Sequence, residues 1–235
     1  MKTLYRIYQL FIALPIGILA TIFLAVIMAV GSTTHSTHIW SYYPGRWWAR
    51  IVLWLLLIPV QVEGRGLLDE KQSYVFVANH QGLFDVFLIY GYLGRNFKWM
   101  MKQSLRRLPF VGFACEKSGQ IFVDRSGPKA IKSTYDKARQ TLKGGTSLTV
   151  FPEGARTFDG TLQPFKRGAF ALADELQLPV VPMTIMPRTR DGHFAVWHPL
   201  TLTIHKPIAP QGKGADNITA TMALAEKAIR QALEE

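Results

Sequence analysis

The chain opens with a long apolar stretch. Leu10–Val30 is uncharged and mostly apolar, and at about 20 residues it matches a helix that crosses the hydrocarbon core of a bilayer. A polar link, GSTTHSTH, separates it from a second apolar run, Ile51–Val60, which is too short to span. Aromatic residues typical of the headgroup level come before that run, namely Trp40, Tyr42, Tyr43, Trp47 and Trp48. The pattern predicts a two-helix hairpin whose second helix is half-immersed or re-entrant.

A secretory signal peptide is the competing interpretation of the first apolar stretch. Lys2 and Arg6 supply a basic start, as such peptides require. The apolar region is long for a signal peptide, however, and no clear A-x-A cleavage site follows it. We therefore expect residues 1–60 to form a retained membrane anchor, with both ends of the hairpin on the cytoplasmic side.

From Gln61 the pattern changes to short apolar runs that alternate with helical periodicity. This alternation predicts that residues 61–235 form a single α/β domain, with a mixed central sheet flanked by helices. Lys102–Phe113, broken by Pro109 and Gly112, is predicted to be a linker. The predicted strands are Tyr74–Ala78, Phe97–Met101, Gln120–Val123, Ser147–Phe151 and Val180–Ile185, with a hairpin or paired strands at Ala195–Ile204. The predicted helices are Leu83–Leu93, Pro128–Leu142, Lys166–Leu176 and Asn217–Leu233.

Charge narrows the class of partner. The 235 residues carry a net charge of +11, so the partner should be anionic, either a nucleic acid or an anionic membrane surface. The basic residues do not gather in a recognition helix, and the apolar N-terminus has no role in nucleic-acid binding, so a membrane surface is favoured. A single cysteine, Cys115, excludes an intramolecular disulfide, and the six histidines show no ligand spacing for a metal.

Polar residues follow the first predicted strand of the α/β domain. Tyr74–Ala78 runs into Asn79 and His80, and Asp85 comes five residues after the histidine. Positions i and i+5 do not share a helix face, so this pair can meet only across a turn, which Gly82 allows. A carboxylate that takes the Nδ1 proton leaves Nε2 free to act as a general base. The alternative is a histidine in a helix cap, with Asp85 only favouring the first helical turn.

Two further predicted strands end in charged residues. Asp124 and Arg125 follow one of them, and Glu153 and Gly154 follow another, with Arg156 just beyond. Ligands of open α/β sheets bind outside the carboxyl ends of strands, and one guanidinium group can bind two phosphate oxygens at once. The strand ends therefore predict one cleft with a base and phosphate ligands, although each charge alone is typical of a solvated surface.

Four segments together resemble a known family. NHQGLFD (Asn79–Asp85), GQIFVDR (Gly119–Arg125), FPEGART (Phe151–Thr157) and VVPMTI (Val180–Ile185) resemble, in order and spacing, the four blocks of the glycerolipid acyltransferases. The bacterial 1-acyl-sn-glycerol-3-phosphate acyltransferases are the most similar, and the resemblance covers residues from about 60 to 210. It implies transfer of an acyl group from an acyl-carrier-protein or coenzyme A thioester to lysophosphatidate, which gives phosphatidate for phospholipid biosynthesis. It also implies no metal or organic cofactor, and a location on the cytoplasmic face of a bacterial inner membrane.

The resemblance also assigns roles to residues of this sequence. His80 would be the general base and Asp85 its orienting partner. The glycerol phosphate would be bound by Arg125, Glu153, Gly154 and Arg156, with Lys102 as a further contact. The acyl pocket or its wall would be shaped by Val181 and Pro182.

Two departures from the family pattern leave the acceptor open. Gly82 stands where the family often has serine, and Ala155 where it usually has threonine, so another lysophospholipid or a lyso-aminolipid remains an alternative acceptor. A non-catalytic membrane-surface scaffold is an alternative of another class, but it leaves the His80–Asp85 pair unexplained. No G-x-S-x-G elbow is present and Cys115 lies outside the four blocks, so direct displacement is expected rather than an acyl-enzyme.

Overall fold

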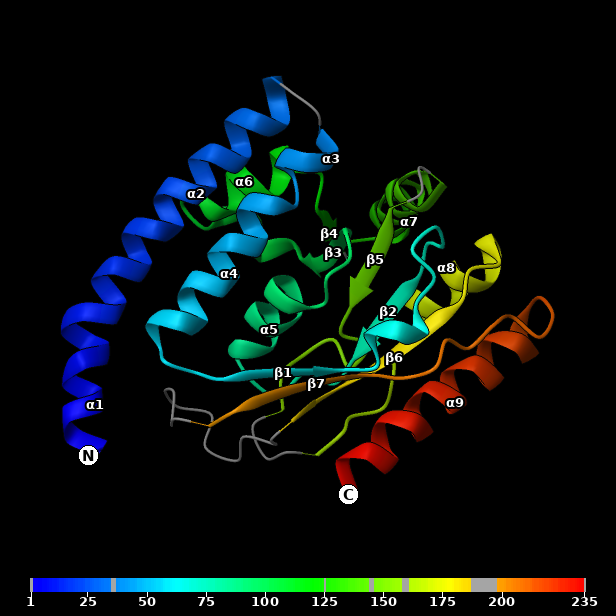
Figure 1. Cartoon of the computed structure of the whole chain (residues 1–235). Coiled ribbons are helices and arrows are strands. Elements are labelled where there is room, and N and C mark those ends of the chain that lie inside the picture. The colour runs from blue at the N-terminus through cyan, green and yellow to red at the C-terminus, as the bar shows by residue number, and fades with distance from the viewer. Residues whose placement is uncertain are drawn as a thin grey trace.

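A seven-stranded sheet forms the centre of the computed structural model (Figure 1), which describes residues 2–34, 37–124, 126–143, 146–157, 161–186 and 198–234. The spatial order is β1-β7-β6-β2-β5-β3-β4. The strands are β1 (Val60–Glu63), β2 (Val75–Ala78), β3 (Phe97–Lys102), β4 (Ile121–Val123), β5 (Ser147–Val150), β6 (Val180–Met186) and β7 (Leu200–Ile204). Neighbouring strands are parallel except β6 and β7, which are antiparallel. The mixed sheet predicted from the sequence is confirmed.

Burial explains which strands the sequence predicted and which it missed. Every residue of β2 and β5 is buried, as expected for central parallel strands with helices on both faces. β1 lies at the edge beside β7 and alternates between half-buried and exposed residues, so its four residues gave no strong apolar run, and the sequence analysis missed it. Of the predicted pairing at Ala195–Ile204, only β7 falls within the described residues, and its partners are β1 and β6.

Helices cover both faces of the sheet (Figure 1). On one face, an apolar cluster packs the sheet against α4 (Tyr43–Leu55) and α5 (Phe84–Tyr92). On the other face, a second cluster packs it against α7 (Pro128–Lys143), α8 (Gly168–Leu176) and α9 (Ala215–Glu234). A short 3-10 turn, η2 (Arg65–Leu67), follows β1. The bounds of α5, α7, α8 and α9 agree with the predicted helices to within two residues at each end, whereas α4 begins before the apolar run Ile51–Val60 and ends within it.

The predicted linker Lys102–Phe113 contains regular structure. A 3-10 helix, η3 (Gln103–Arg107), directly follows β3, and the short helix α6 (Val111–Lys117) begins within the predicted linker. Pro109 lies in the turn between the two and Gly112 in the first turn of α6, where Val111 N–H donates to the Pro109 carbonyl and Gly112 N–H to that of Leu108. The breakers therefore marked a tight turn rather than an irregular segment.

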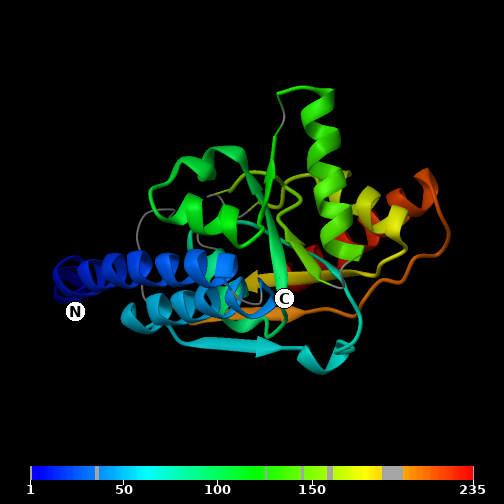
Figure 2. The ribbon, with the colours of Figure 1, turned by 90° about the horizontal axis from the view of Figure 1, so that it is seen from above.

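The N-terminal region forms a helical hairpin against the α/β domain. α1 (Lys2–Tyr8), the π-helical turn η1 (Gln9–Ala13) and α2 (Leu14–Thr34) follow each other without a break. The stretch Thr3–Thr34 is long and apolar enough to cross a membrane. After α3 (Thr37–Trp40) the chain returns through α4, and α2 lies between α4 and α6 (Figure 2). Met28 and Leu53 belong to the same buried cluster as residues of the sheet, so the hairpin and the sheet share a core. The predicted boundary at residue 60 stays a prediction.

A half-buried lysine, Lys98, lies where the hairpin meets β3. Lys98 Nζ donates to the Ser118 carbonyl at 2.7 Å and to the Ser41 hydroxyl, which lies between α3 and α4. Burial lowers the pKa of Lys98 to about 8, and the nearby charge of Lys137 adds to the effect. Because the unfolded chain keeps the ordinary value of 10.5, it holds more protons than the folded chain between about pH 8 and 10.5. Stability from this group therefore rises with pH across that window and is lost below it.

We expect Lys98→Met to be more stable relative to wild type at pH 7 than at pH 10. As pH rises through the window, the free energy of unfolding of the wild type should rise relative to that of the variant by a few kcal/mol at most. Denaturant unfolding of both proteins in the same detergent at pH 7 and pH 10 measures the difference. Lys129→Met, at an exposed position on α7, is the matched control and should show no such change. A Lys98→Met difference that is constant with pH would contradict the prediction.

Candidate active site

The site begins where β2 ends, next to β6. The Asn79 side chain is buried and bonds both backbone groups of one β6 residue: its Oδ1 accepts from Ile185 N–H at 2.8 Å, and its Nδ2 donates to the Ile185 carbonyl at 3.1 Å. A buried amide that bonds the facing strand in this way fixes the end of β2. The next residue, His80, therefore leaves the sheet at a set position on its carboxyl edge.

His80 and Asp85 meet across the turn into α5. The Oδ2 atom of Asp85 lies 2.8 Å from His80 Nδ1, and it also accepts the backbone N–H groups of Gln81 at 2.7 Å and Gly82 at 2.9 Å. The carboxylate is 4% exposed and stands in the first turn of α5, where the helix dipole favours negative charge. An ionised carboxylate only accepts hydrogen bonds, so Nδ1 carries the ring proton. The contact predicted from the five-residue spacing is present.

Arg156 reaches the other ring nitrogen. Its Nε–H donates to His80 Nε2 at 3.2 Å, and because guanidinium only donates, Nε2 must hold a lone pair. Asp85 and Arg156 thus select the same neutral tautomer from opposite sides. The Phe151 ring stacks on the imidazole with centroids 3.8 Å apart and planes 9° apart, which fixes the plane of the ring. The arrangement gives a base whose accepting atom lies beside a cation.

Glu153 is buried and ties two loops together. One carboxylate oxygen accepts His80 N–H at 2.7 Å and the other accepts Gln163 N–H at 2.8 Å. Burial raises the pKa of Glu153, an effect that Asp85 adds to and these two N–H groups oppose. A buried carboxylate whose two oxygens already accept backbone bonds offers a phosphate no donor and adds like charge. The geometry therefore favours a positioning role for Glu153 toward His80, and the phosphate contact that the resemblance implied stays a prediction.

The other residues expected to bind phosphate are distributed along this edge. Gly154 has a φ of +77°, and a Cβ at this position would lie 2.2 Å from Lys166 Nζ, so the glycine lets a second cation lie close to the loop. Lys102 is exposed at the carboxyl end of β3. Arg125 lies outside the described residues, so its predicted contact stays a prediction.

The sequence analysis missed Phe151 and Gln81 as parts of the site. Phe151 was predicted as the end of a strand and the start of the block Phe151–Thr157, with no role in the site. Gln81 is 2% exposed, and its side-chain amide has no hydrogen-bond partner in the described parts of the chain. An unpaired buried amide is costly unless water or a ligand bonds it. The signal in the sequence that could have indicated Gln81 was its position directly after His80.

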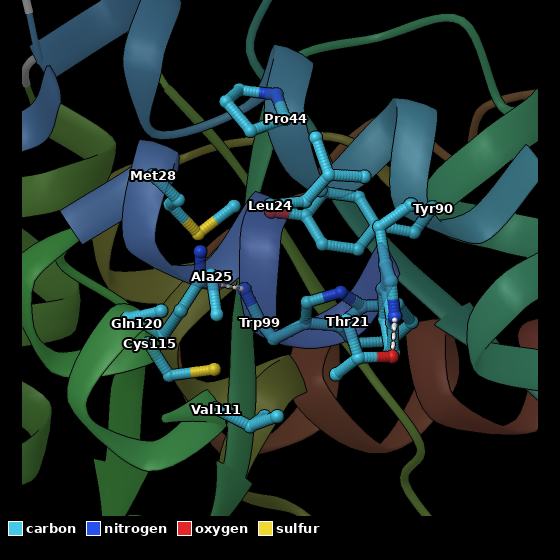
Figure 3. A pocket seen from close by; sticks show the side chains of 13 residues that line it. Thr21, Leu24, Ala25, Met28, Pro44, Tyr90, Trp99, Val111, Cys115 and Gln120 are labelled. Carbon is cyan, nitrogen blue, oxygen red and sulfur yellow. Dashed lines mark hydrogen bonds between the residues drawn. The ribbon is translucent and has the colours of Figure 1, made fainter. Parts of the chain in front are cut away.

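An apolar cavity lies between the N-terminal hairpin and the sheet (Figure 3). Its wall includes Trp99, whose ring stacks on Phe151 with centroids 5.4 Å apart, and Phe151 in turn stacks on His80. The other lining residues come from α2, α4, α5, α6 and the segment before β4: Thr21, Leu24, Ala25, Met28, Pro44, Gly45, Trp48, Tyr90, Val111, Ala114, Cys115 and Gln120. Val181 and Pro182 lie in β6 beside β2 and do not line this cavity, so their predicted acyl contact stays a prediction.

Two other chemistries find little support in the site. Burial raises the pKa of the Cys115 thiol to about 11, which keeps it neutral and a weak nucleophile near pH 7. Among the described residues, no group of three or more His, Cys, Asp or Glu side chains could hold a metal ion. What the geometry does provide is a positioned neutral imidazole beside a cation and an apolar cavity.

Comparison with known proteins gives a family match. Residues 59–186 match the family model described as acyltransferase. A solved 1-acyl-sn-glycerophosphate acyltransferase from Thermotoga maritima superposes with a TM-score of 0.79, covering 99% of this chain and 94% of that one at 24% sequence identity. At this identity the likeness supports the fold, including the mixed sheet and the long N-terminal apolar helix.

Curated relatives are similar over shorter parts of their own length. A chloroplast 1-acyl-sn-glycerol-3-phosphate acyltransferase of Arabidopsis thaliana is 30% identical over 90% of this chain and 61% of its own. The 1-acyl-sn-glycerol-3-phosphate acyltransferase of Saccharomyces cerevisiae is 34% identical over 63% of this chain and 50% of its own. That of Helicobacter pylori is 34% identical over 55% of each. The chain thus spans between half and two thirds of the length of these relatives.

Proposed function

Because the chain belongs to the acyltransferase family, we propose that it moves a fatty acyl group from an acyl thioester to the free hydroxyl of 1-acyl-sn-glycerol-3-phosphate, making phosphatidate. The names of the curated relatives support this acceptor. The observation that carries the proposal is the His80 ring, held at Nδ1 by Asp85 and at Nε2 by Arg156. The donor would be a thioester of acyl carrier protein or coenzyme A.

The chemistry follows from the tautomer. His80 Nε2 takes the proton of the acceptor hydroxyl as that oxygen attacks the thioester carbonyl carbon, and Asp85 stabilises the imidazolium that forms. The new C–O bond forms, the tetrahedral oxyanion collapses, and the C–S bond breaks. The leaving thiolate then takes the proton from His80. General-base help of this kind contributes roughly 100- to 10,000-fold in rate.

Arg156 links recognition of the acceptor to this step. In the structure its Nε–H occupies the lone pair that the mechanism needs. A phosphate is a stronger partner for guanidinium than a neutral imidazole. The acceptor's phosphate therefore draws Arg156 away from Nε2 and leaves that atom to the hydroxyl. A lysolipid without an exposed phosphate monoester lacks this means of freeing the base.

The surroundings fit lipid substrates. The apolar cavity behind Phe151 and Trp99 offers a place for the donor's acyl chain. The N-terminal apolar helix would hold the enzyme at the membrane where acceptor and product reside, on the cytoplasmic face of a bacterial inner membrane. Lys102, Lys166 and Arg156 would attract the acceptor's anionic headgroup.

A panel of acceptors tests the proposal. The protein is assayed in detergent with lysophosphatidate, lysophosphatidylcholine and monoacylglycerol, each with both thioester donors, and products are identified by mass spectrometry. Phosphatidate as the main product supports the proposal. Equal or faster acylation of another lysolipid would replace it with the broader lysolipid acyltransferase, the alternative that Gly82 and Ala155 left open. No acylation by the folded protein would favour a scaffold.

We expect Arg156→Ala to lower kcat/KM for lysophosphatidate by about 10- to 100-fold, the value of a charge-assisted hydrogen bond to phosphate. Turnover of monoacylglycerol should not fall, because the variant also frees Nε2. The ratio of the two kcat/KM values measures the effect. Arg230→Ala on α9, where the arginine pairs with Glu226, is the matched control and should leave the ratio unchanged. Equal losses on both acceptors would contradict a phosphate-specific role.

A further inference from the structure

A cluster of exposed apolar side chains lies outside the N-terminal hairpin, on the segment Gln103–Lys117, which we call the η3–α6 segment. Leu105 is 40% exposed, Leu108 46%, Phe110 52% and Phe113 55%. Single exposed apolar residues are ordinary on a protein surface. Four large ones within nine positions make a patch of the kind that marks an interaction site.

The backbone holds this patch in a strained conformation. Phe110 has a φ of +59°, which is unusual for a bulky residue. The turn is also tight, since Ala114 N–H donates to the Phe110 carbonyl, and a Cβ on Gly112 would lie 2.2 Å from the Arg106 carbonyl oxygen. The strained residue thus carries an aromatic ring that is about half exposed, so packing in the core does not account for the strain. Leu57, at the end of α4, combines a φ of +54° with 55% exposure in the same way.

The segment that carries the patch lies beside another element with exposed apolar side chains. α6 packs on α2, and both α6 and the N-terminal helix extend to the same side of the sheet (Figure 2). The large side chains of the N-terminal helix that stay at least half exposed include Leu14, Ile18, Leu19 and Phe23. An anchor with exposed apolar residues therefore lies next to a second, separate exposed apolar element.

Basic residues flank the patch. Lys102, Arg106, Arg107 and Lys117 lie on or beside the segment, against one acid, Glu116, which pairs with Arg106. The Lys117 ammonium lies 5.4 Å from the centre of the Phe113 ring. Apolar side chains with adjacent cations are the pattern of an element that inserts at the boundary between headgroups and acyl chains of an anionic bilayer.

We propose that the η3–α6 segment is a second membrane-inserted element, and that its partner is an anionic phospholipid bilayer. Leu108, Phe110 and Phe113 enter the acyl boundary while the basic residues bind headgroups. The segment directly follows β3, whose carboxyl end shares the sheet edge with His80. Insertion therefore places that edge at headgroup depth, and this consequence for catalysis rests on the proposed function. A protein would be the other kind of partner, but the flanking cations and the packing of α6 on the N-terminal apolar helix favour lipid.

Depth measurement tests the proposal without relying on activity. The full-length chain with Cys115→Ala receives a spin label through Phe113→Cys, and is bound to vesicles of phosphatidylglycerol and phosphatidylcholine. Phe23→Cys on α2 gives the reference for lipid contact, and Leu224→Cys, 48% exposed on α9, is the matched control for water contact. We expect the label at position 113 to be relaxed more by oxygen than by a water-soluble nickel complex, as at 23 and opposite to 224.

Other outcomes of this measurement would overturn the proposal. A label at position 113 that behaves like the one at 224 excludes insertion. A label that stays in water on vesicles but becomes immobile when acyl carrier protein is added identifies a protein-docking surface instead. Equal depth on vesicles of phosphatidylcholine alone would refute the contribution of anionic headgroups.

A double variant separates this inference from the proposed function. Phe110→Gly with Phe113→Ser removes two exposed rings and relieves the strained φ, so it should fold. We expect its acyl transfer to lysophosphatidate in vesicles to fall by about tenfold or more, with no change in detergent, while Leu224→Ser changes neither. Unchanged activity in vesicles contradicts the proposal, whereas absence of activity in detergent from wild type and variant alike would instead refute the proposed function.

Discussion

Replacing His80 by alanine should lower kcat/KM for lysophosphatidate by about 100- to 10,000-fold, the usual contribution of a positioned general base. The loss should appear mainly in kcat, because the ring acts on the proton that moves in the transition state and contributes little to holding the acceptor. The measurement is phosphatidate formation in detergent at saturating lysophosphatidate, with each thioester donor. His80→Gln, whose amide can still donate to Asp85, should be impaired to a similar degree because an amide is not a base at neutral pH.

The control for this prediction is another histidine in the same fold. His205 follows β7 and contacts the Thr184 hydroxyl at 2.7 Å, and His205→Ala should keep turnover close to wild type. Circular dichroism and thermal unfolding establish that all variants fold. Undiminished phosphatidate formation by folded His80→Ala would exclude the proposed mechanism. The base would then have to be another group on this edge.

Asp85→Asn should also cost about a hundredfold or more in kcat, for a different reason. Asp85 accepts from the imidazole and from two backbone N–H groups. All three bonds end on the same oxygen, Oδ2, so an asparagine oxygen in its place keeps them and leaves the ring proton on Nδ1. The neutral amide does not stabilise the imidazolium that forms when Nε2 takes the acceptor's proton, so the cost falls on the transition state.

Nitrogen NMR of protein labelled in its histidine rings separates loss of the negative charge from loss of the tautomer. His80 should show a protonated Nδ1 and an unprotonated Nε2 in wild type and in Asp85→Asn alike. Asp136→Asn, at an aspartate on α7 that pairs with Arg139, is the matched control and should change neither tautomer nor rate. A reversed tautomer in Asp85→Asn would show that the carboxylate acts by setting the ring proton instead.

The N-terminal hairpin and the α/β domain together form the cavity next to the candidate active site. The cavity beside Trp99 has walls from α2 and α4 as well as from β3 and α6. Changes in the hairpin helices can therefore alter the space next to the candidate active site, although α2 lies far from His80 in sequence. The contact between Lys98 and Ser41 ties the same two parts together a few residues before Pro44 of the cavity wall.

The sequence predicted most of the sheet, because its central strands are buried on both faces and therefore appear as apolar runs. It missed β1, where half-buried and exposed residues alternate along four positions, and η3–α6, where breaker residues in a tight turn suggested a linker. Within the site, the five-residue spacing and Gly82 predicted the contact of His80 with Asp85, since that contact depends on one local turn.

Only the tertiary structure decided what the other site residues do. Glu153, Phe151 and Arg156 come from a loop more than seventy residues after His80, and they meet it because β5 pairs with β2. Sequence position could place their charges near the edge but not assign their contacts. The carboxylate of Glu153 bonds backbone N–H groups, and Arg156 bonds the base itself. Local turns are set by neighbouring residues, whereas contacts across a sheet depend on how distant strands pack, and this is why one part of the site was predictable and the other was not.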